Sequence, residues 1–267
     1  MTSAKLLTIA GSDSLAGGGL QSDLATFSEL NVFGLAAVTA VVSIGKDEVQ
    51  TDALPVEFLK HQLASIGHVE DLAAIKVGFL ADLEQAEVVA EFLQAHPNLP
   101  IVLDPVLSLK EGSLAENERL LDFYRQHLLP GVTVITPNVG ELALLANQAV
   151  GDYGQAQRAA KQLMATAGPA IWLTIGERFK RAFPEDLFLS ESSTVAFGQD
   201  KLSEPIYNNG AGCTFSAALA VNLAKGMPVL KAGIIAQDFV HAAIRKGVPL
   251  GAYYAGGSVW PAGHRFN

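Results

Sequence analysis

Cysteine is nearly absent from this sequence, since Cys213 is the only one among 267 residues. A lone cysteine cannot form a disulfide within the chain, and it leaves no cysteine cluster for a structural zinc site. The six histidines have none of the short spacings that hold zinc, so we assign no zinc site. These scarcities favour a protein of a reducing compartment, and we expect it in the cytoplasm.

Positive charge is also scarce. The chain has 18 Lys and Arg against 27 Asp and Glu, a formal net charge of −9, and no basic block occurs along it. Such a chain would repel the phosphate backbone of nucleic acid, so we expect no nucleic-acid partner. The apolar run in residues 1–10 is too short for a signal peptide or a membrane span, and Gly, Pro or charge interrupts the longer runs. We therefore expect no membrane partner.

Hydrophobic residues are abundant at 49%, against 17% charged residues. This balance is typical of a chain whose central strands are covered on both faces. Short aliphatic runs alternate with longer amphipathic stretches, which indicates repeated βαβ units around a mostly parallel sheet. No internal repeat and no linker rich in Ser, Gly or Pro divides the sequence, so residues 1–267 are expected to form a single α/β domain.

The alternation also predicts where the elements lie. Strands are expected at residues 5–10, 36–42, 74–77, 100–103, 132–135 and 170–173, an extended piece at 49–54, and a hairpin of 186–189 with 194–197. Helices are expected at residues 18–30, 55–66, 83–94, 138–145, 156–167, 212–224 and 229–246. Ligands bind at the carboxyl ends of the strands in such sheets. The loops at 11–17, 104–112, 136–141 and 208–212 should therefore converge on a site.

A glycine-rich segment precedes one alanine-rich helix. It reads Asn-Gly-Ala-Gly-Cys-Thr at residues 209–214. Small residues at the start of a helix allow successive backbone N–H groups to point at one anion, which predicts a phosphate site. The alternative is an ordinary loop before a buried helix, because the segment lacks the lysine of a P-loop and the third glycine of a dinucleotide-binding motif.

Cys213 lies in the first turn of that predicted helix. The helix dipole there would favour the thiolate and lower the pKa of the thiol, so that the side chain could take a proton. The alternative is a small buried apolar side chain, which is the usual state of a free cysteine.

Polar side chains follow several of the predicted strands. Asp104 ends one strand, and Asn138 and Glu141 lie in the first turn of the helix after another. Such oxygen ligands suit Mg²⁺, which binds few carboxylates directly. The alternative is a helix cap alone, since Asn138 is a good cap and Glu141 a good third residue. Asp13 and Asp23 could contact a polar substrate, and plain solvation is the alternative for both.

Five segments, taken together, carry a family resemblance. They are Ala-Gly-Ser-Asp-Ser at residues 10–14, residues 17–23, Asp-Pro-Val at 104–106, Thr-Pro-Asn-x-x-Glu at 136–141, and Gly-Ala-Gly-Cys-Thr-Phe-Ser-Ala-Ala at 210–218. In order and spacing the chain resembles the ribokinase superfamily over about residues 5–246. More narrowly, it resembles the vitamin-kinase branch, which contains hydroxymethylpyrimidine and phosphomethylpyrimidine kinases and the pyridoxal kinases built like them.

The resemblance implies a three-layer ribokinase-like fold with a small lid, in a phosphotransferase that is usually a homodimer. ATP and Mg²⁺ are the implied cofactors, and the implied acceptor is a hydroxymethyl group on a heteroaromatic ring. Within the glycine-rich segment, Gly210, Ala211 and Gly212 would form the anion hole for the transferring phosphoryl group. Cys213 stands where most ribokinases have the catalytic Asp, and cysteine there marks the vitamin-kinase branch.

The resemblance also assigns the remaining site residues. Asp104, Asn138 and Glu141 would organise Mg²⁺ and phosphate, with Asp104 and Glu141 as metal ligands. Residues implied on the nucleotide and substrate sides are Thr174 and Gly176 for the nucleotide-phosphate loop, and Asp13, Gly19 and Asp23 for the substrate.

Two departures bear on the substrate. Phosphomethylpyrimidine kinases typically have Ala-Gln-Asn-Thr at the end of the second strand, where the Gln pairs with the pyrimidine amino group, whereas this chain has Ile44 in place of the Gln. An unpaired amino group in a buried pocket costs about 1–3 kcal/mol, so we expect a B6 vitamer: pyridoxal, pyridoxine or pyridoxamine. Leu109 stands where some pyridoxal kinases carry a lid cysteine. A pyrimidine kinase of thiamine synthesis and a catalytically silent ligand-binding homologue stay open as alternatives.

Overall fold

The computed structural model describes residues 4–44, 49–107, 114–176, 178–179, 185–198, 200, 202, 206–251 and 257–266. They contain a nine-stranded sheet in the order β3-β2-β1-β4-β5-β6-β7-β8-β9. The parallel strands are β1 (Lys5–Asp13), β2 (Phe33–Ile44), β4 (Leu72–Val77), β5 (Ile101–Leu103), β6 (Val134–Ile135) and β7 (Ala170–Leu173). The antiparallel strands are β3 (Val49–Ala53), β8 (Glu185–Leu189) and β9 (Thr194–Gly198). The predicted, mostly parallel sheet is confirmed.

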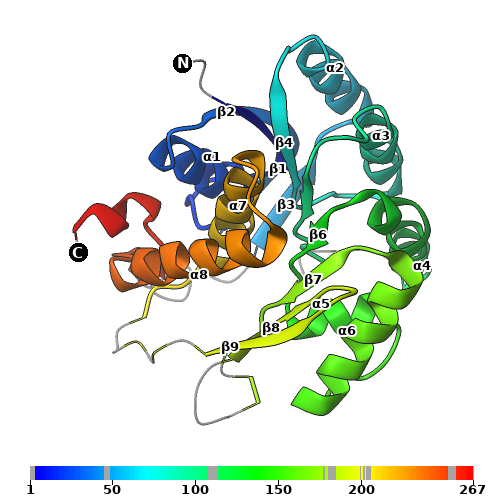
Figure 1. Cartoon of the computed structure of the whole chain (residues 1–267). Helices are drawn as coiled ribbons and strands as arrows, with labels where there is room; N and C mark the ends of the chain where they lie inside the picture. The colour runs from blue at the N-terminus through cyan, green and yellow to red at the C-terminus, as the bar shows by residue number, and fades with distance from the viewer. Residues whose placement is uncertain are drawn as a thin grey trace.

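Helices cover both faces of this sheet (Figure 1). One face carries α1 (Gly19–Glu29), α7 (Ala211–Ala224) and α8 (Val229–Arg245). The other carries α2 (Val56–Ile66), α3 (Leu83–Gln94), α4 (Leu114–Phe123), α5 (Val139–Leu145) and α6 (Tyr153–Ala167). Successive strand residues supply the two cores alternately, since Leu6 packs with the α7 side and Leu7 with the α3 side. The three-layer α/β class expected from the sequence is therefore confirmed.

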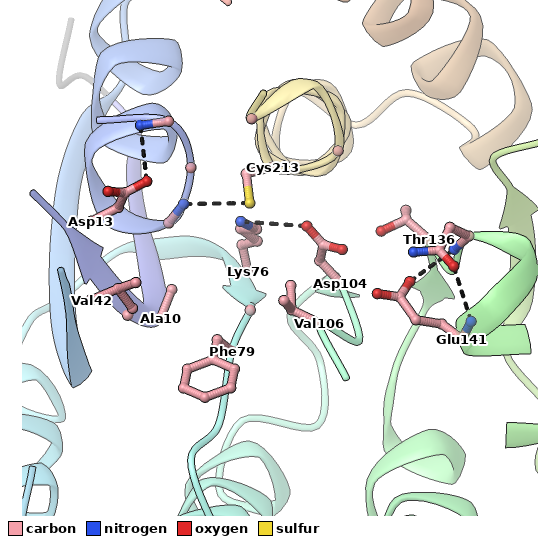
Figure 2. A pocket seen from close by; sticks show the side chains of 18 of the residues that line it. Ala10, Asp13, Val42, Lys76, Phe79, Asp104, Val106, Thr136, Glu141 and Cys213 are labelled. Atoms are coloured by element: carbon pink, nitrogen blue, oxygen red, sulfur yellow. Dashed lines mark hydrogen bonds and ion pairs between the residues drawn. The ribbon is translucent and has the colours of Figure 1, made fainter. Parts of the chain in front are cut away.

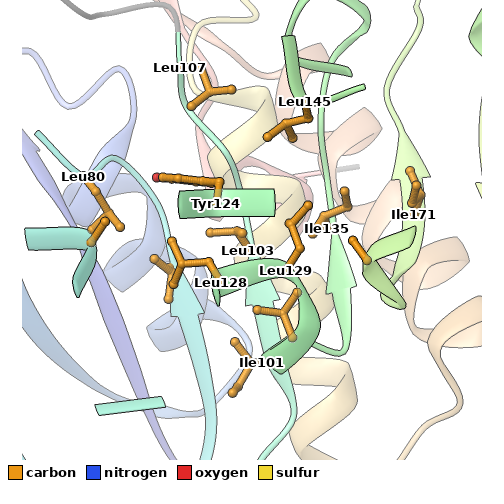
Figure 3. Close-up of a cluster of buried hydrophobic side chains, with 14 of the residues drawn as sticks. Leu80, Ile101, Leu103, Leu107, Tyr124, Leu128, Leu129, Ile135, Leu145 and Ile171 are labelled. Atoms are coloured by element: carbon orange, nitrogen blue, oxygen red, sulfur yellow. The ribbon is translucent and has the colours of Figure 1, made fainter. Parts of the chain in front are cut away.

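The larger core holds the carboxyl ends of the central strands in place. Figure 3 shows Leu103, Ile135 and Ile171 from three adjacent strands in one cluster with Tyr124 and Leu128 of the π-helical turn that follows α4 (Tyr124–Leu128). All five side chains are fully or almost fully buried. Each large apolar side chain buried in this way contributes about 1.5–3 kcal/mol. The loops that leave these strands therefore start from fixed points.

Some elements differ from the prediction. β1 runs on to Asp13 because, after a register shift past Ala10, Ser12 and Asp13 pair with Val41 and Val42 of β2. The predicted loop at 11–17 was therefore wrong in its first three residues. The elements that the sequence did not predict are α4, the π-helical turn, the 3₁₀ turns Leu129–Gly131 and Pro261–Phe266, and the short pair β10 (Val248–Pro249) and β11 (Gly257–Ser258).

Candidate active site

A cavity of about 580 Å³ lies at the carboxyl ends of the parallel strands. All four loops that were expected to converge contribute to its wall, which confirms that prediction for the described residues. The lining residues from these loops are Gly11, Asp13, Gly17, Asp104, Val106, Thr136, Asn138, Glu141, Asn208, Gly210 and Gly212. Figure 2 shows Asp13 towards one end and Glu141 towards the other, with Cys213, Lys76 and Asp104 between them.

Two glycines bring the first loop against the start of α7. Gly210 has φ +82°, and a Cβ built there would lie 2.4 Å from the Gly17 carbonyl oxygen. Gly19 has φ +57°, and its Cβ would lie 2.2 Å from the Gly11 carbonyl oxygen. A side chain at either position would clash with backbone and strain the left-handed conformation. Glycine at position 210 thus allows the start of α7 to lie against the first loop, and glycine at position 19 allows that loop to fold back against β1.

The start of α7 offers fewer free amides than the sequence suggested. Gly212 lines the cavity, but Ala211 does not. The Ala211 N–H donates to the Asn208 carbonyl oxygen at 3.0 Å, and the Ala211 side chain packs against the core under α7. The prediction that Ala211 belongs to the anion hole was therefore wrong. The N–H groups of Gly212 and Cys213 lie in the first helical turn, where the α-helix itself provides no acceptor.

Cys213 lies on the cavity wall, as expected, but its acidity differs from the prediction. Its Sγ accepts a hydrogen bond from the Gly19 N–H at 3.4 Å, and the residue is partly buried. Burial raises the pKa of the thiol to about 12, against the lowering effect of the Lys76 ammonium. The expectation that the helix dipole makes this thiol acidic was wrong, because removing a thiolate from water costs more than the dipole returns.

Lys76 is the functional candidate that the sequence reasoning missed. It lies on central strand β4, is fully buried and contributes to the cavity floor. Its Nζ lies 2.6 Å from Asp23 Oδ1 and 3.8 Å from Asp104 Oδ2. Burial lowers the pKa of Lys76, but the nearby Asp23, Cys213 and Asp104 outweigh it and raise that pKa above its usual value. The only available signal was a lysine inside an apolar strand, which needs a buried partner.

Asp23 holds this lysine and does not reach the cavity. Its side chain is fully buried, with Oδ1 on Lys76 and Oδ2 accepting the Thr8 hydroxyl at 2.6 Å. The prediction that Asp23 contacts substrate was therefore wrong, since both of its oxygens are engaged behind the floor. Asp104 does line the cavity, and the Ser216 hydroxyl donates to its Oδ2 at 2.9 Å.

Asp13 lines the cavity while it shapes its own turn. One oxygen accepts the Leu15 N–H at 2.9 Å and the other accepts the Gly17 N–H at 3.0 Å. The carboxylate therefore fixes the chain that leads into α1. Ile44, the last residue of β2, also lines the cavity, whereas Leu109 lies outside the described residues.

Asn138 and Glu141 close a capping box at the start of α5. The Glu141 N–H donates to Asn138 Oδ1 at 3.0 Å, and the Asn138 N–H donates to Glu141 Oε2 at 2.8 Å. The capping alternative is thus correct as a description of these bonds, yet both residues also line the cavity. Burial, together with the neighbouring Asp104 carboxylate, raises the pKa of Glu141 to about 8.

These acidic residues fit a divalent cation. Two carboxyl groups close enough to raise a pKa would both be stabilised by Mg²⁺, which takes few protein carboxylates and keeps several waters. The buried Thr136 hydroxyl beside them has no hydrogen-bond partner among the residues described. No group of three or more His, Cys, Asp or Glu that could hold a metal occurs in the described part of the chain. The residues present therefore suit a cation shared with a ligand rather than one held by protein alone.

The loop after β7 is only partly as predicted. Thr174 lines the cavity, and its N–H donates to the Pro137 carbonyl oxygen at 2.9 Å. Gly176 is not part of the cavity lining. Its N–H donates to Asp186 at 3.2 Å, so this amide has a partner within the chain, and nucleotide-phosphate binding by Gly176 stays a prediction.

A family model described as phosphomethylpyrimidine kinase matches residues 13–258. The chain belongs to this family. Among curated relatives, it is 34% identical to the pyridoxine kinase of Bacillus subtilis, covering 95% of this chain and 94% of the relative. It is 33% identical to the hydroxymethylpyrimidine/phosphomethylpyrimidine kinase of Haemophilus influenzae, covering 96% of both. The vitamin-kinase resemblance and the phosphotransferase class are thus confirmed.

Solved structures extend this similarity to the fold. The chain matches the crystal structure of the ADP complex of Bacillus subtilis pyridoxal kinase with a TM-score of 0.92 and 31% identity, covering all of both chains. The curated relatives of the two specificities are almost equally identical to this chain. Overall identity therefore establishes the phosphotransferase class, and the choice of ring rests on individual residues. No helix in the described ranges combines the length and apolar character of a bilayer span.

Proposed function

We propose that the protein transfers the γ-phosphoryl group of ATP to the 5′-hydroxymethyl group of a B6 vitamer. The observation that carries this choice is Ile44, which lines the cavity at the end of β2. Apolar Val42, Phe79 and Val106 line the same cavity, and Figure 2 shows them as a group at one side of it. A flat pyridine ring suits this wall, whereas the amino group of the pyrimidine would lose its partner at Ile44, at a cost of about 1–3 kcal/mol.

Charge at the middle of the cavity supports phosphoryl transfer. The transition state is loose and spreads negative charge over the phosphoryl oxygens, so fixed donors and cations provide most of the catalysis. The N–H groups of Gly212 and Cys213 and the buried Lys76 ammonium are the donors and the cation available here. Lys76 keeps its charge throughout because Asp23 and Asp104 hold it.

Cys213 is proposed to orient the acceptor hydroxyl and relay its proton: Sγ takes the hydroxyl proton while the thiol proton passes to an oxygen of the transferred phosphoryl group. A thiol whose pKa is about 12 is neutral at pH 7, so its sulfur does not start the reaction as a strong base. A loose transition state needs little removal of the hydroxyl proton before the phosphoryl group arrives. Sγ faces the cavity and can accept the hydrogen bond that aligns this hydroxyl.

Asp104 and Glu141 are the residues proposed to hold Mg²⁺, with Thr136 and Asn138 beside them. When bound, the cation would neutralise phosphate charge. On the protein side, the capping box keeps Glu141 in place, and Ser216 together with Lys76 keeps Asp104 in place.

Turnover measured side by side on pyridoxal, pyridoxine and hydroxymethylpyrimidine tests the substrate. We expect the higher kcat/KM with a B6 vitamer, and a higher value with the pyrimidine would replace this proposal with the thiamine-pathway kinase. Calorimetry with ADP, with and without Mg²⁺, tests the third reading, because nucleotide binding without turnover on any of these rings would indicate a silent homologue. A cytoplasmic homodimer stays a prediction, which light scattering of the purified protein would check for the oligomer.

A further inference from the structure

A half-buried carboxylate outside the cavity binds the loop that forms one of its walls. Asp186, on β8, accepts the N–H groups of Ile175 at 2.7 Å and Gly176 at 3.2 Å through Oδ1. Its Oδ2 accepts the side-chain amide of Gln237 on α8 at 3.0 Å, and Gln237 is only 7% exposed. One side chain thus links the end of β7 to a helix on one face of the sheet (Figure 1).

The sheet does not need this carboxylate for its own pairing. β7 and β8 already pair backbone to backbone at Ile171, Trp172 and Leu173. Burial raises the pKa of Asp186 even though three donors act to lower it, so keeping the charge there has a cost. Two consecutive N–H groups directed at one oxygen also form the kind of concavity that binds anions. In this protein that concavity is filled from within the chain.

This arrangement also holds Thr174 in place. Thr174 lines the cavity, its hydroxyl donates to the Pro137 carbonyl oxygen at 3.3 Å, and its backbone pairs with Asn138 as an isolated bridge. Thr174 is therefore fixed on one side by the loop after β6, through its bond to Pro137. On the other side it is fixed by the following residue, Ile175, whose N–H donates to Asp186. A change at Asp186 or Gln237 would move Thr174 relative to Asn138 without touching any ligand.

We propose that Asp186 and Gln237 are positioning residues for the nucleotide: they fix residues 174–176 so that Thr174 meets the nucleotide phosphates beside Asn138. This inference rests on the proposed function, because it takes the acidic end of the cavity to be the nucleotide end. Neither residue belongs to the cavity lining, so both act through the loop.

Exchange of the two polar groups tests the pair. Gln237→Glu places a carboxylate against the Asp186 carboxylate and should weaken ADP binding about tenfold or more, the effect of losing a hydrogen bond to a charged group. Asp186→Asn keeps an oxygen for the loop, and Gln237 can turn its amide to meet it, so a smaller effect is expected. In the Asp186→Asn/Gln237→Glu double variant the asparagine amide donates to the new carboxylate, and ADP affinity should recover most of the loss.

Isothermal calorimetry with ADP gives these affinities, and thermal melting identifies variants that remain folded. Pyridoxal affinity and kcat should stay close to those of the parent while KM for ATP follows the ADP affinity. Gln162→Glu on α6, an exposed change of the same kind, is the matched control and should change none of them.

Three results would overturn the inference. The first is a folded Gln237→Glu variant that binds ADP as tightly as the parent protein. The second is a double variant whose ADP affinity stays as low as that of Gln237→Glu. An equal loss of ADP and pyridoxal affinity would indicate a general structural role instead. A parent protein that binds no ADP at all would overturn the proposed function together with this inference, so the two failures are distinguishable.

Discussion

The two ends of the cavity differ in the polarity of the side chains that line them. Near β2, the side chains of Val42, Ile44 and Phe79 are apolar. At the other end lies the Glu141 carboxyl group, whose pKa is raised to about 8 by burial and by the neighbouring Asp104 carboxylate. The first end also holds Asp13, but the oxygens of that carboxylate accept the Leu15 and Gly17 N–H groups, so this end selects a ligand mainly by shape and by the hydrogen bonds that it fails to offer. The second end selects by charge. Choice of ring and handling of phosphate are therefore separate tasks in this protein.

Between the two ends lies a buried pair of opposite charges. The side chains of Lys76 and Asp23 are both fully buried, and of the two only Lys76 belongs to the cavity lining. Desolvating an ion pair costs about as much as the pair returns, so stability alone gives little reason to keep it. Its position below Cys213, as Figure 2 shows, gives a functional reason, because it places a fixed cation where the two ends meet.

The largest expected effect comes from breaking this middle region. Lys76→Met keeps the length of the side chain but leaves Asp23 buried without its cation, which should lower the free energy of unfolding by about 3–5 kcal/mol. Urea denaturation followed by circular dichroism measures the change. The Asp23→Asn/Lys76→Met double variant removes both charges and should recover most of the loss. A single variant as stable as the parent would mean that the ion pair contributes nothing to folding.

Cys213→Ala should separate chemistry from binding at the same place. Turnover is expected to fall by about 10² to 10⁴, the usual contribution of a positioned proton-transfer group. ADP affinity, which depends on the acidic end and on the helix amides, should change little. Stopped assays and ADP calorimetry on one preparation measure both, with Cys213→Ser as the variant that retains a hydrogen-bonding group. Parent-like turnover of the alanine variant would remove the cysteine from the mechanism.

The parts of the fold and site that the sequence could predict depend on local pattern. Hydrophobic periodicity gave α3 at its observed bounds, Leu83–Gln94, and the ends of the strands gave the converging loops. α4 is rich in charged residues, and it was missed. The links that matter most join residues far apart along the chain, such as Lys76 with Asp23 and Gln237 with Asp186. A lysine inside an apolar strand indicates that a buried partner exists, but nothing in the local sequence identifies that partner.

The acidity of Cys213 illustrates the same limit. The helix start is visible in the sequence, and the dipole it brings lowers the pKa of a thiol. Burial of the thiol beneath the first loop dominates in the folded chain and raises this pKa, and the negative charges of Asp104 and Asp23 raise it further. The helix-dipole rule therefore gave the wrong direction for this pKa, because segments far apart in the sequence determine how well the thiolate is solvated.

The rate at which Cys213 reacts with an alkylating reagent tests the comparison between the two ends of the cavity. It does so because this rate depends on how well water solvates the thiolate midway between them. A pKa raised from about 9 to about 12 lowers the thiolate fraction at pH 8 by about 10³. A more basic thiolate is also more nucleophilic, which offsets part of this decrease. The alkylation rate at pH 8 should therefore be about 50-fold lower than that of an ordinary thiol. Alkylation by iodoacetamide, followed by mass spectrometry, should keep accelerating from pH 8 to pH 11. Steric hindrance alone would predict a slow rate that levels off at about pH 10, one unit above the ordinary thiol pKa of about 9, and such a plateau would contradict the raised pKa.

The smallest expected effect, and the one that bears most directly on the apolar end, is that of Ile44→Gln. The new amide can pair with the amino group of a pyrimidine, so the ratio of kcat/KM for hydroxymethylpyrimidine to that for pyridoxal should rise about tenfold, equivalent to about 1.4 kcal/mol for one regained hydrogen bond. Ile44→Leu keeps the wall apolar and should leave the ratio unchanged. ADP affinity should be the same in both variants, since the phosphate end is untouched. If the glutamine weakens ADP as much as pyridoxal, the two ends are coupled, and ring choice and phosphate handling are a single task after all.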